Sequence, residues 1–550
     1  MKLNNNIFKT FPAITFGFIL FFAPISFSQS NGFEVVRSLE QLDQIYEHLE
    51  KYYVDDIQTG NLSKVAIDAM LKELDPYTVY YHESNIEDYQ LMTTGQYGGI
   101  GSLIRKKGDY VYVAEPYEGN PAQIAGLLAG DKILAIEGKS MVNKNTEDVS
   151  NALKGPKGTT IKVDVERING EKKSISITRD EIKLPDVPYS GMLDNSIGYI
   201  KLNSFTRTAA ADVKTAFTEL KSKGMKELVL DLRGNGGGLL IEAVKIVNMF
   251  VPRNQSVVTT KGRIEDENRD YKTMEEPIDL SIPLVVLVDE GSASASEIVS
   301  GSLQDLDRAV IVGTRTFGKG LVQRTYDLEY GSKVKLTIAK YYTPSGRCVQ
   351  RLEYYDKIEG QKAAEVPDSL IKIFKTKNGR DVIDGRGIDP DITVEEKELS
   401  RLSLTLLQNN FFFDYATEFY YTNPTIESAN AFQLSDEQYS KFKDFILKQD
   451  FNYSTATEEM LKEMRSVAEE EGFYEGAESE YDELMKKVTP SKERDLEKFK
   501  VQIKQILENE IVSRYYYQKG RAENSFRDDN YIKESKRILK DISAYNTILK

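Results

Sequence analysis

The 550-residue sequence contains no tryptophan, one cysteine and only two histidines. Because Cys348 stands alone, the chain cannot form an intramolecular disulfide or a multi-cysteine zinc site. His48 and His82 both lie far upstream of the glycine- and serine-rich segments described below. The net charge of −14 argues against a nucleic-acid partner, which requires a basic surface. We expect no metal and no cofactor.

Long apolar runs are also absent, except near the N-terminus. Lys2 and Lys9 precede an apolar run over residues 11–27, and small polar residues follow it. This order is typical of a secretory signal, and the run is short for a bilayer span of roughly 20 residues. We therefore expect residues 1–28 to be a signal peptide cleaved near Ser28, and the protein to work in the periplasm or cell envelope. An uncleaved anchor is the alternative.

The remaining chain is long enough for several domains. Helical apolar spacing predicts an N-terminal helical segment at 29–92, and short strands with glycine turns predict a small β domain at 93–181. Val- and Leu-rich runs, each followed by a small-residue turn and an amphipathic helix, indicate an α/β core with a mixed sheet at 182–397. Within it, residues 351–384 are polar and predict a surface insertion. Residues 398–550 are polar and helical, which completes an α+β multidomain protein.

Several elements are specific enough to be predicted individually from these patterns. The predicted strands are residues 111–113, 132–136, 161–165, 174–177, 227–231, 284–289 and 333–341, and the predicted core helices are residues 239–250 and 295–306.

Two glycine-rich turns lie in the core. The first, residues 232–238, connects a predicted strand to a helix, where its backbone N–H groups suit a phosphate or a developing oxyanion. It does not fit the dinucleotide fingerprint, which would need glycine at Leu239; a plain connecting turn is the alternative. The second, residues 313–320, matches a phosphate-binding loop except at Gly320, where Ser or Thr is needed for magnesium. Extended sequence follows it instead of a helix, so we reject that interpretation.

A third turn, residues 97–101, precedes a strand of the β domain. A turn that presents successive backbone amides beside a strand edge can hold the terminal carboxylate of a peptide while the peptide adds a strand.

A serine cluster, residues 292–297, directly follows the predicted strand at 284–289. Helix capping by a serine with an acidic residue three positions later would explain one serine. If Ser294 is a nucleophile, its base is not a nearby histidine, and Lys319 is the best candidate. Lowering a lysine pKa from about 10.4 to 7–8 takes roughly 4 kcal/mol, which a dry pocket supplies by desolvation. The apolar neighbours Phe317, Leu321 and Val322 are consistent with such a pocket.

These segments closely resemble the carboxyl-terminal processing (tail-specific) serine proteases. The resemblance runs from roughly Leu39 to Thr393 and is most specific at residues 230–235, 292–298, 304–305, 308–309, 312–313, 316–320, 323, 342–347 and 387–391. It implies a PDZ domain at 93–181 and a serine protease core at 182–397. Many members carry proline where this chain has Gly236, so the loop is expected to be more flexible here.

The resemblance also implies roles for individual residues. They are the nucleophile Ser294, the lysine base Lys319, Gln323 to orient that lysine, Asp305 in a supporting role, and an oxyanion hole formed by the N–H of Ala295 and one from Gly237 or Gly238. Peptide C-termini are expected at the PDZ turn formed by Tyr97, Gly98, Gly99, Ile100 and Gly101.

The expected function is that of a serine endopeptidase that cleaves exported proteins near their C-termini. Unfolded or C-terminally exposed polypeptides are then its partners, and the helical tail is a candidate surface for a homodimer or an adaptor. The alternative is a catalytically silent PDZ–protease scaffold that recruits partners in the cell envelope. A hydrolase of cell-wall material would use the aromatic residues 411–421 as a sugar platform, but a helix core explains them better.

Overall fold

The computed structural model describes residues 31–354, 363–395 and 398–550, so the expected signal peptide lies outside the described residues. The chain divides into two compact parts, residues 1–70 and 71–550, which are described separately. The first contains α1 (Asn31–Tyr52) and most of α2 (Thr59–Lys72), with exposed apolar side chains such as Leu39 and Ile45. Within the described ranges, no helix is both long enough and apolar enough to cross a membrane.

The second part begins with a short strand that the sequence did not predict. Val79–Tyr81 forms β1, which pairs antiparallel with β18 (Lys333–Tyr342), before η1 (Glu83–Asn85) and α3 (Ile86–Thr94). The apolar spacing predicts a helical segment over residues 29–92 and no strand within it. A valine followed by two tyrosines suits a pleated, half-buried surface, and pairing with a distant strand decides its conformation.

The β domain contains an antiparallel sheet in the order β3-β4-β5-β7-β8, with β6 paired to β5, and a separate β2–β9 pair. Its strands are β2 (Gln96–Gly99), β3 (Ser102–Lys107), β4 (Tyr110–Pro116), β5 (Lys132–Ile136), β6 (Lys139–Ser140), β7 (Thr160–Glu166), β8 (Lys172–Thr178) and β9 (Asp180–Lys183). The helices α4 (Pro121–Ile124) and α5 (Thr146–Leu153) complete it. Alternating apolar residues such as Val111, Val113 and Val163 fill its core.

The core is built on a six-stranded sheet in the order β10-β11-β12-β15-β16-β23. These strands are β10 (Tyr189–Met192), β11 (Ile197–Lys201), β12 (Glu227–Asp231), β15 (Leu284–Val288), β16 (Val310–Gly313) and β23 (Ile392–Thr393). Only β10 runs antiparallel to its neighbour; the other four pairings are parallel. The carboxyl ends of β12 and β15 therefore meet at one edge, where loops carry functional residues.

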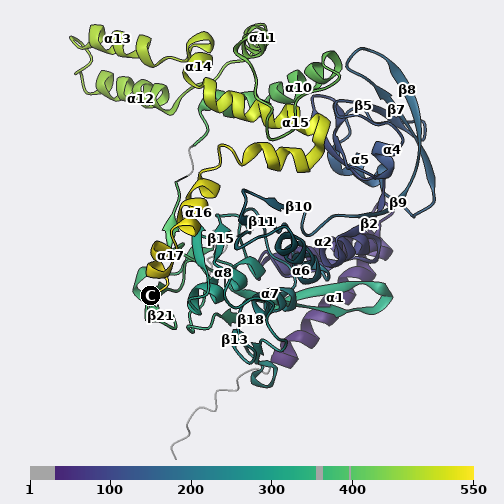
Figure 1. The fold of residues 1–550 in the computed structure, drawn as a ribbon. Coiled ribbons are helices and arrows are strands. Elements are labelled where there is room, and N and C mark those ends of the chain that lie inside the picture. The colour runs from purple at the N-terminus through teal and green to yellow at the C-terminus, as the bar shows by residue number, and fades with distance from the viewer. Residues whose placement is uncertain (1–30, 355–362, 396–397) are drawn as a thin grey trace, which may run out of the picture. The chain divides into compact units, whose positions relative to one another are not determined.

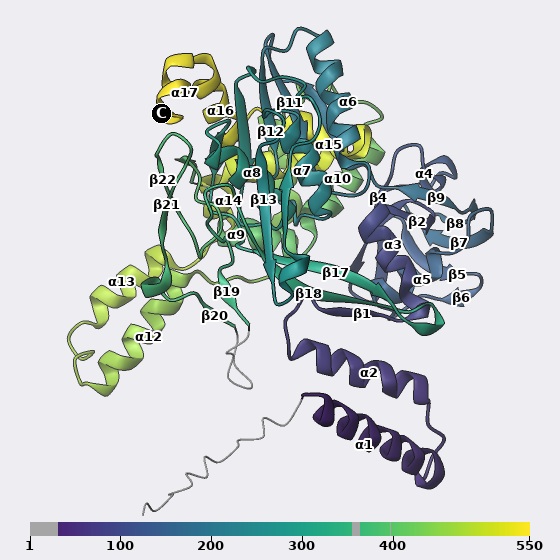
Figure 2. The same cartoon turned by 90° about the horizontal axis from the view of Figure 1, so that it is seen from below.

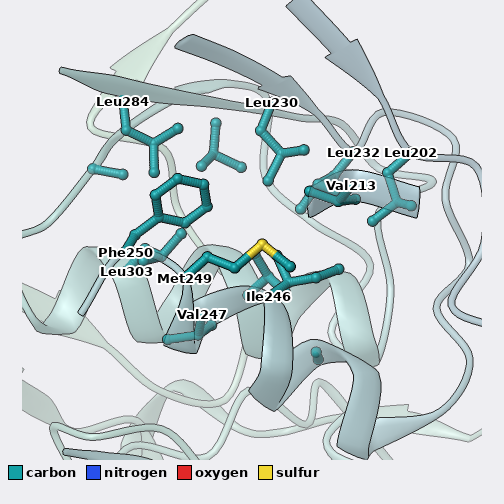
Figure 3. Close-up of a cluster of buried hydrophobic side chains, with 14 of the residues drawn as sticks. Leu202, Val213, Leu230, Leu232, Ile246, Val247, Met249, Phe250, Leu284 and Leu303 are labelled. Carbon is teal, nitrogen blue, oxygen red and sulfur yellow. The ribbon is translucent and has the colours of Figure 1, made fainter. Parts of the chain in front are cut away.

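Both faces of this sheet are covered, as continuous apolar strands require. On one face, α6 (Ala209–Ser222), α7 (Leu240–Asn248) and α8 (Ala295–Asp305) pack against Leu230 and Leu284. Figure 3 shows Ile246 and Phe250 from the α7 region reaching these leucines. On the other face, α16 (Asn530–Lys540) and α17 (Ile542–Ile548) pack against the alternate strand residues.

A second sheet extends the core, in the order β1-β18-β13-β14 with β17 paired to β18. It is formed by β13 (Ser256–Gly262), β14 (Arg269–Lys272) and β17 (Leu321–Asp327) together with β1 and β18. Figure 2 shows β17 and β18 as a long two-stranded ribbon. The predicted insertion at 351–384 contains two antiparallel strand pairs, β19 (Leu352–Glu353) with β20 (Ala364–Glu365) and β21 (Ile373–Lys375) with β22 (Asp381–Ile383).

The polar tail is helical, as predicted. It comprises α9 (Arg401–Gln408), α10 (Phe411–Thr422), α11 (Asp436–Leu447), α12 (Ala456–Glu470), α13 (Glu478–Val488), α14 (Lys492–Lys498) and α15 (Lys500–Ser525), followed by α16 and α17. The aromatic residues Phe412, Tyr415 and Phe419 are buried among α9, α11 and α15, which supports a helix core and not a sugar platform. Figure 1 shows α15 near the β domain and α16 beside β15.

Candidate active site

Ser294 stands at a sharp turn between β15 and α8. Its backbone has φ 56° and ψ −111°, a left-handed conformation that costs a non-glycine residue on the order of 1–3 kcal/mol. The preceding turn is fixed by Asp289, whose Oδ1 accepts hydrogen bonds from the N–H groups of Gly234 (2.8 Å) and Gly291 (3.0 Å). A strained strand-to-helix turn of this kind presents a serine hydroxyl at the edge of a sheet.

The fully buried carboxylate of Glu297 joins this turn to the segment that carries Lys319. Its Oε2 accepts from the backbone N–H groups of Ser294 and Lys319, both at 2.8 Å. Its Oε1 accepts from the hydroxyl of Thr316 (2.6 Å) and the N–H of Gly318 (2.7 Å). Burial raises the pKa of Glu297, while these four donors act in the opposite direction. One side chain therefore sets the separation of the two backbone segments.

Lys319 lies in a largely dry environment. Its Nζ is 4.1 Å from the centroid of the Tyr77 ring. The pKa of Lys319 is lowered from 10.5 to about 8, chiefly by burial and then by the positive charge of Lys335, while the carboxylates of Glu297 and Asp75 oppose the shift. Among the described residues, no hydrogen bond joins Lys319 Nζ to Ser294 Oγ. Catalytic hydrogen bonds often tighten only when substrate is bound.

The glycine-rich loop touches the serine turn. A Cβ placed on Gly237 would lie 2.8 Å from the Cβ of Ser294 and 2.9 Å from the backbone N of Ala295, so only glycine fits there. The N–H of Gly237 already donates to Asn235 Oδ1 at 2.9 Å. In the described part of the chain, the N–H groups of Ala295 and Gly238 donate to no protein acceptor.

Asn235 links this loop to the start of α8, a role that the sequence did not predict. Its carbonyl accepts from the N–H of Ala293 (3.0 Å) and the hydroxyl of Ser296 (2.8 Å), and its Nδ2 donates to the carbonyl of Leu202 (2.9 Å). The side chain is completely buried. An asparagine inside a glycine-rich loop was the only available signal, and it does not identify the partners.

Gln323 belongs to a chain of hydrogen-bonded side chains near Lys319. The Nε2 of Gln323 donates to the hydroxyl of Thr337 at 3.2 Å, and the N–H of Thr337 donates to the hydroxyl of Thr78. Thr78 in turn donates to Asp75 at 3.0 Å, so Gln323 belongs to a polar network on the Lys319 side of the site. No hydrogen bond joins Gln323 directly to Lys319 among the described residues.

Asp305 lies at the other end of α8, which separates it from Ser294 by the length of an 11-residue helix. Its carboxylate pairs with Arg347 at 2.8 Å and accepts from the N–H of Ser345 at 2.9 Å, with both charged side chains almost completely buried. The structure therefore does not bring Asp305 to the serine turn; the residue anchors the loop at 343–347.

A groove of about 450 Å³ lies beside the loop and the Lys319 segment. Leu240, Val322 and Tyr271 contribute apolar walls, Gln323 lines it, and a partly exposed Ile241 opens onto it. The groove is large enough for a single amino-acid side chain and its neighbouring backbone.

The predicted peptide-binding turn lies at the start of an open sheet edge. Tyr97, Gly98 and Gly99 belong to β2, whereas Ile100 and Gly101 connect β2 to the edge strand β3, which α5 flanks. In the described residues, the N–H groups of Ile100 and Gly101 have no protein acceptor. Gly101 has φ 72°, and a Cβ there would meet the Asn120 side chain at 2.5 Å, so glycine is required.

Three protein-family models match parts of the chain. Residues 196–359 match peptidase family S41, residues 112–167 match the PDZ domain, and residues 402–539 match the model "Probable PDZ-protease, C-terminal helical domain". A peptidase core combined with a PDZ domain defines the class: the protein is a serine peptidase, and the multidomain α+β fold expected from the sequence is confirmed.

Individual relatives extend the match over most of the chain. A "Probable CtpA-like serine protease" of Staphylococcus aureus is 32% identical over 414 residues, which cover 72% of this chain and 82% of the relative. A "Carboxy-terminal-processing protease" of Bartonella bacilliformis is 35% identical over 59% of this chain and 75% of the relative. The solved structure of a photosystem II D1 C-terminal processing protease is 29% identical, covers 66% of this chain and 92% of its own, and gives a TM-score of 0.36. The two sequence relatives, each more than 30% identical and covered over more than two thirds of its length, show that the chain belongs to the carboxy-terminal-processing proteases of peptidase family S41.

Among the described residues, no group of three or more histidine, cysteine, aspartate or glutamate side chains is arranged to hold a metal ion.

Proposed function

We propose that the protein is an exported endopeptidase that hydrolyses polypeptides near their C-termini through a Ser294–Lys319 dyad. The observation that carries this proposal is a shared hydrogen-bond acceptor. One oxygen of the Glu297 carboxylate, Oε2, accepts from the backbone N–H groups of both Ser294 and Lys319. A pKa of about 8 gives Lys319 a substantial neutral fraction near neutral pH, as a general base requires.

The reaction is acyl transfer. Ser294 Oγ attacks the scissile carbonyl carbon while Lys319 Nζ, moving from the Tyr77 ring, accepts the hydroxyl proton. The N–H groups of Ala295 and Gly238 stabilise the oxyanion; we favour Gly238 over Gly237 because the N–H of Gly237 is already bonded to Asn235. Lys319 then donates its proton to the leaving amine, and water hydrolyses the acyl ester.

Gln323 supports this step from the network that surrounds Asp75, whose negative charge acts on Lys319. The groove beside Leu240 and Val322 receives a side chain of the substrate close to the scissile bond. The apolar walls of the groove favour an apolar side chain.

The PDZ domain selects the substrate. Free N–H groups at Ile100 and Gly101 bind the terminal carboxylate, and the last residues of the substrate add a strand to the open edge of β3. Recognition then depends on a free, charged C-terminus. The N-terminal segment directs the protein out of the cytoplasm.

The test uses an unfolded reporter chain that ends in apolar residues, offered with either a free or an amidated C-terminus. We expect the wild-type protein to cleave the free form and to cleave the amidated form at least 10-fold more slowly, because the amide removes the charge that the turn binds. Ser294→Ala and Lys319→Ala should bind the reporter without cleaving it. Wild-type cleavage by either variant would refute the dyad, whereas binding without cleavage by the wild type would indicate a silent scaffold.

A further inference from the structure

An ion pair connects the start of the C-terminal helix α16 to the glycine-rich loop beside Ser294. Asp529 caps α16: its Oδ1 accepts from the N–H groups of Tyr531 (2.8 Å) and Ile532 (3.1 Å). Its second carboxylate oxygen, Oδ2, pairs with the guanidinium of Arg233 at 2.9 Å. Arg233 stands in the glycine-rich loop, almost 300 residues earlier in the chain.

Arg233 is held from three sides. Its Nη2 lies 2.6 Å from Asp231 Oδ2 as well as 2.9 Å from Asp529, and its guanidinium carbon lies 4.6 Å from the centroid of the Tyr531 ring. Asp231 is itself fixed by the hydroxyl of Tyr199 at 2.6 Å and by Lys201 at 3.2 Å. Since the Arg233 side chain is only 17% exposed, these contacts are partly shielded from solvent screening.

The backbone next to Arg233 is connected directly to the serine turn. Lys201 Nζ also donates to the carbonyl of Arg233, and the next residue, Gly234, donates its N–H to Asp289. Asn235 then holds Ala293, and Gly237 contacts Ser294. A displacement of the Arg233 side chain therefore reaches the oxyanion donors through only a few rigid contacts.

We propose that Asp529 is a positioning residue for catalysis: acting through Arg233, it holds the loop at 234–238 where the N–H of Gly238 meets the developing oxyanion. The inference rests on the proposed peptidase function and adds that the C-terminal segment is part of the catalytic apparatus. Asp529 touches neither the substrate nor the reacting atoms.

The variant Asp529→Asn tests this role in the full-length protein. Asparagine retains an oxygen that caps α16 and loses the charge that pairs with Arg233. The matched control is Asp541→Asn: Asp541 caps α17 in the same way, accepting from the N–H of Ala544 at 3.0 Å. Both variants remove one negative charge from a helix N-terminus, so their difference isolates the contact with Arg233.

We expect Asp529→Asn to lower kcat about 10-fold with KM changed by less than about 2-fold, because a small misplacement of a catalytic loop weakens transition-state binding more than substrate binding. Affinity for a peptide aldehyde, which forms a tetrahedral adduct, should fall by the same factor. Asp541→Asn should match the wild type. In an Arg233→Met background, which leaves no cation to pair with residue 529, Asp529→Asn should have no further effect.

Amide hydrogen exchange of residues 232–239 gives a readout that does not depend on hydrolysis. Exchange should accelerate in Asp529→Asn and stay unchanged in Asp541→Asn. Unchanged kcat and exchange in Asp529→Asn, or equal changes in both variants, would overturn the positioning role. If the wild type and Ser294→Ala were equally inactive, the proposed function would fail, and the exchange comparison would still decide whether Asp529 orders the loop.

Discussion

The pH dependence of hydrolysis provides a quantitative test of Lys319 as the base. Its environment lowers the pKa from 10.5 to about 8. At about 1.4 kcal/mol per unit, this shift corresponds to roughly 3 kcal/mol against the charged amine. At pH 7, about 10% of the amine is then neutral, compared with roughly 0.03% for an ordinary lysine, a difference of about 300-fold in active enzyme.

We therefore expect kcat/KM to rise about tenfold per pH unit below pH 8 and to level off above it. The assay is the initial rate of cleavage of a quenched fluorescent peptide at low substrate concentration, measured between about pH 6 and pH 10 at constant ionic strength. A profile that stays flat over this range, or whose midpoint lies near pH 10, would contradict a desolvated lysine base.

A charge substitution makes this test specific. The positive charge of Lys335 helps to lower the pKa of Lys319, so Lys335→Met should move the midpoint to higher pH. Methionine retains much of the aliphatic length, which limits other effects. Lys333→Met, two residues away on the same strand, is the matched control, because Lys333 pairs with Asp327 and is not among the causes that shift Lys319. Equal midpoints in both variants would refute the reasoning.

Three further predictions separate catalytic from structural roles. Lys319→Met should abolish activity and yet raise the urea midpoint of unfolding at pH 7. The reason is that the lowered pKa of Lys319 destabilises the folded state by up to about 3 kcal/mol below pH 8. This destabilisation disappears as the pH rises towards 10.5, so the two proteins should then become equally stable. Gly237→Ala should lower kcat about 100-fold, because the added Cβ meets the side chain of Ser294. Gly236→Ala is the control: its Cβ enters open space, so activity should stay within about 2-fold. Equal rates in the two variants would contradict the close approach of Gly237 to Ser294. Asp305→Ala should lower the free energy of unfolding by about 3–5 kcal/mol by leaving Arg347 buried and unpaired, with near-normal kcat for the folded protein; an intact stability curve would contradict this.

Elements with strong local patterns could be predicted from the sequence. The predicted strands at 132–136 and 227–231 coincide with β5 and β12, and the predicted helix at 295–306 ends one residue beyond α8. Runs of branched apolar residues and a helical apolar stripe determine these elements locally, and the structure changes only their ends.

Long-range contacts could not be predicted in this way. The spacing of Glu297 alone fits a helix cap, and its carboxylate does accept a hydrogen bond from the N–H of Ser294. Its second bond, accepted from the backbone N–H of Lys319 22 residues later, has no local sequence pattern. The pairing of Asp529 with Arg233 is still more distant in sequence. The strand β1 was missed for the same reason, because its partner lies in β18.

Covalent labelling of the nucleophile tests the assignment of the catalytic serine most directly. The protein is incubated with a fluorophosphonate, digested, and mapped by mass spectrometry, with labelling rates followed across pH. We predict a single adduct on Ser294, formed at a rate that rises with pH as Lys319 loses its proton, and no adduct in Ser294→Ala. A principal adduct on another residue, or labelling of Ser294 that is equally fast in Lys319→Ala, would contradict the serine–lysine mechanism.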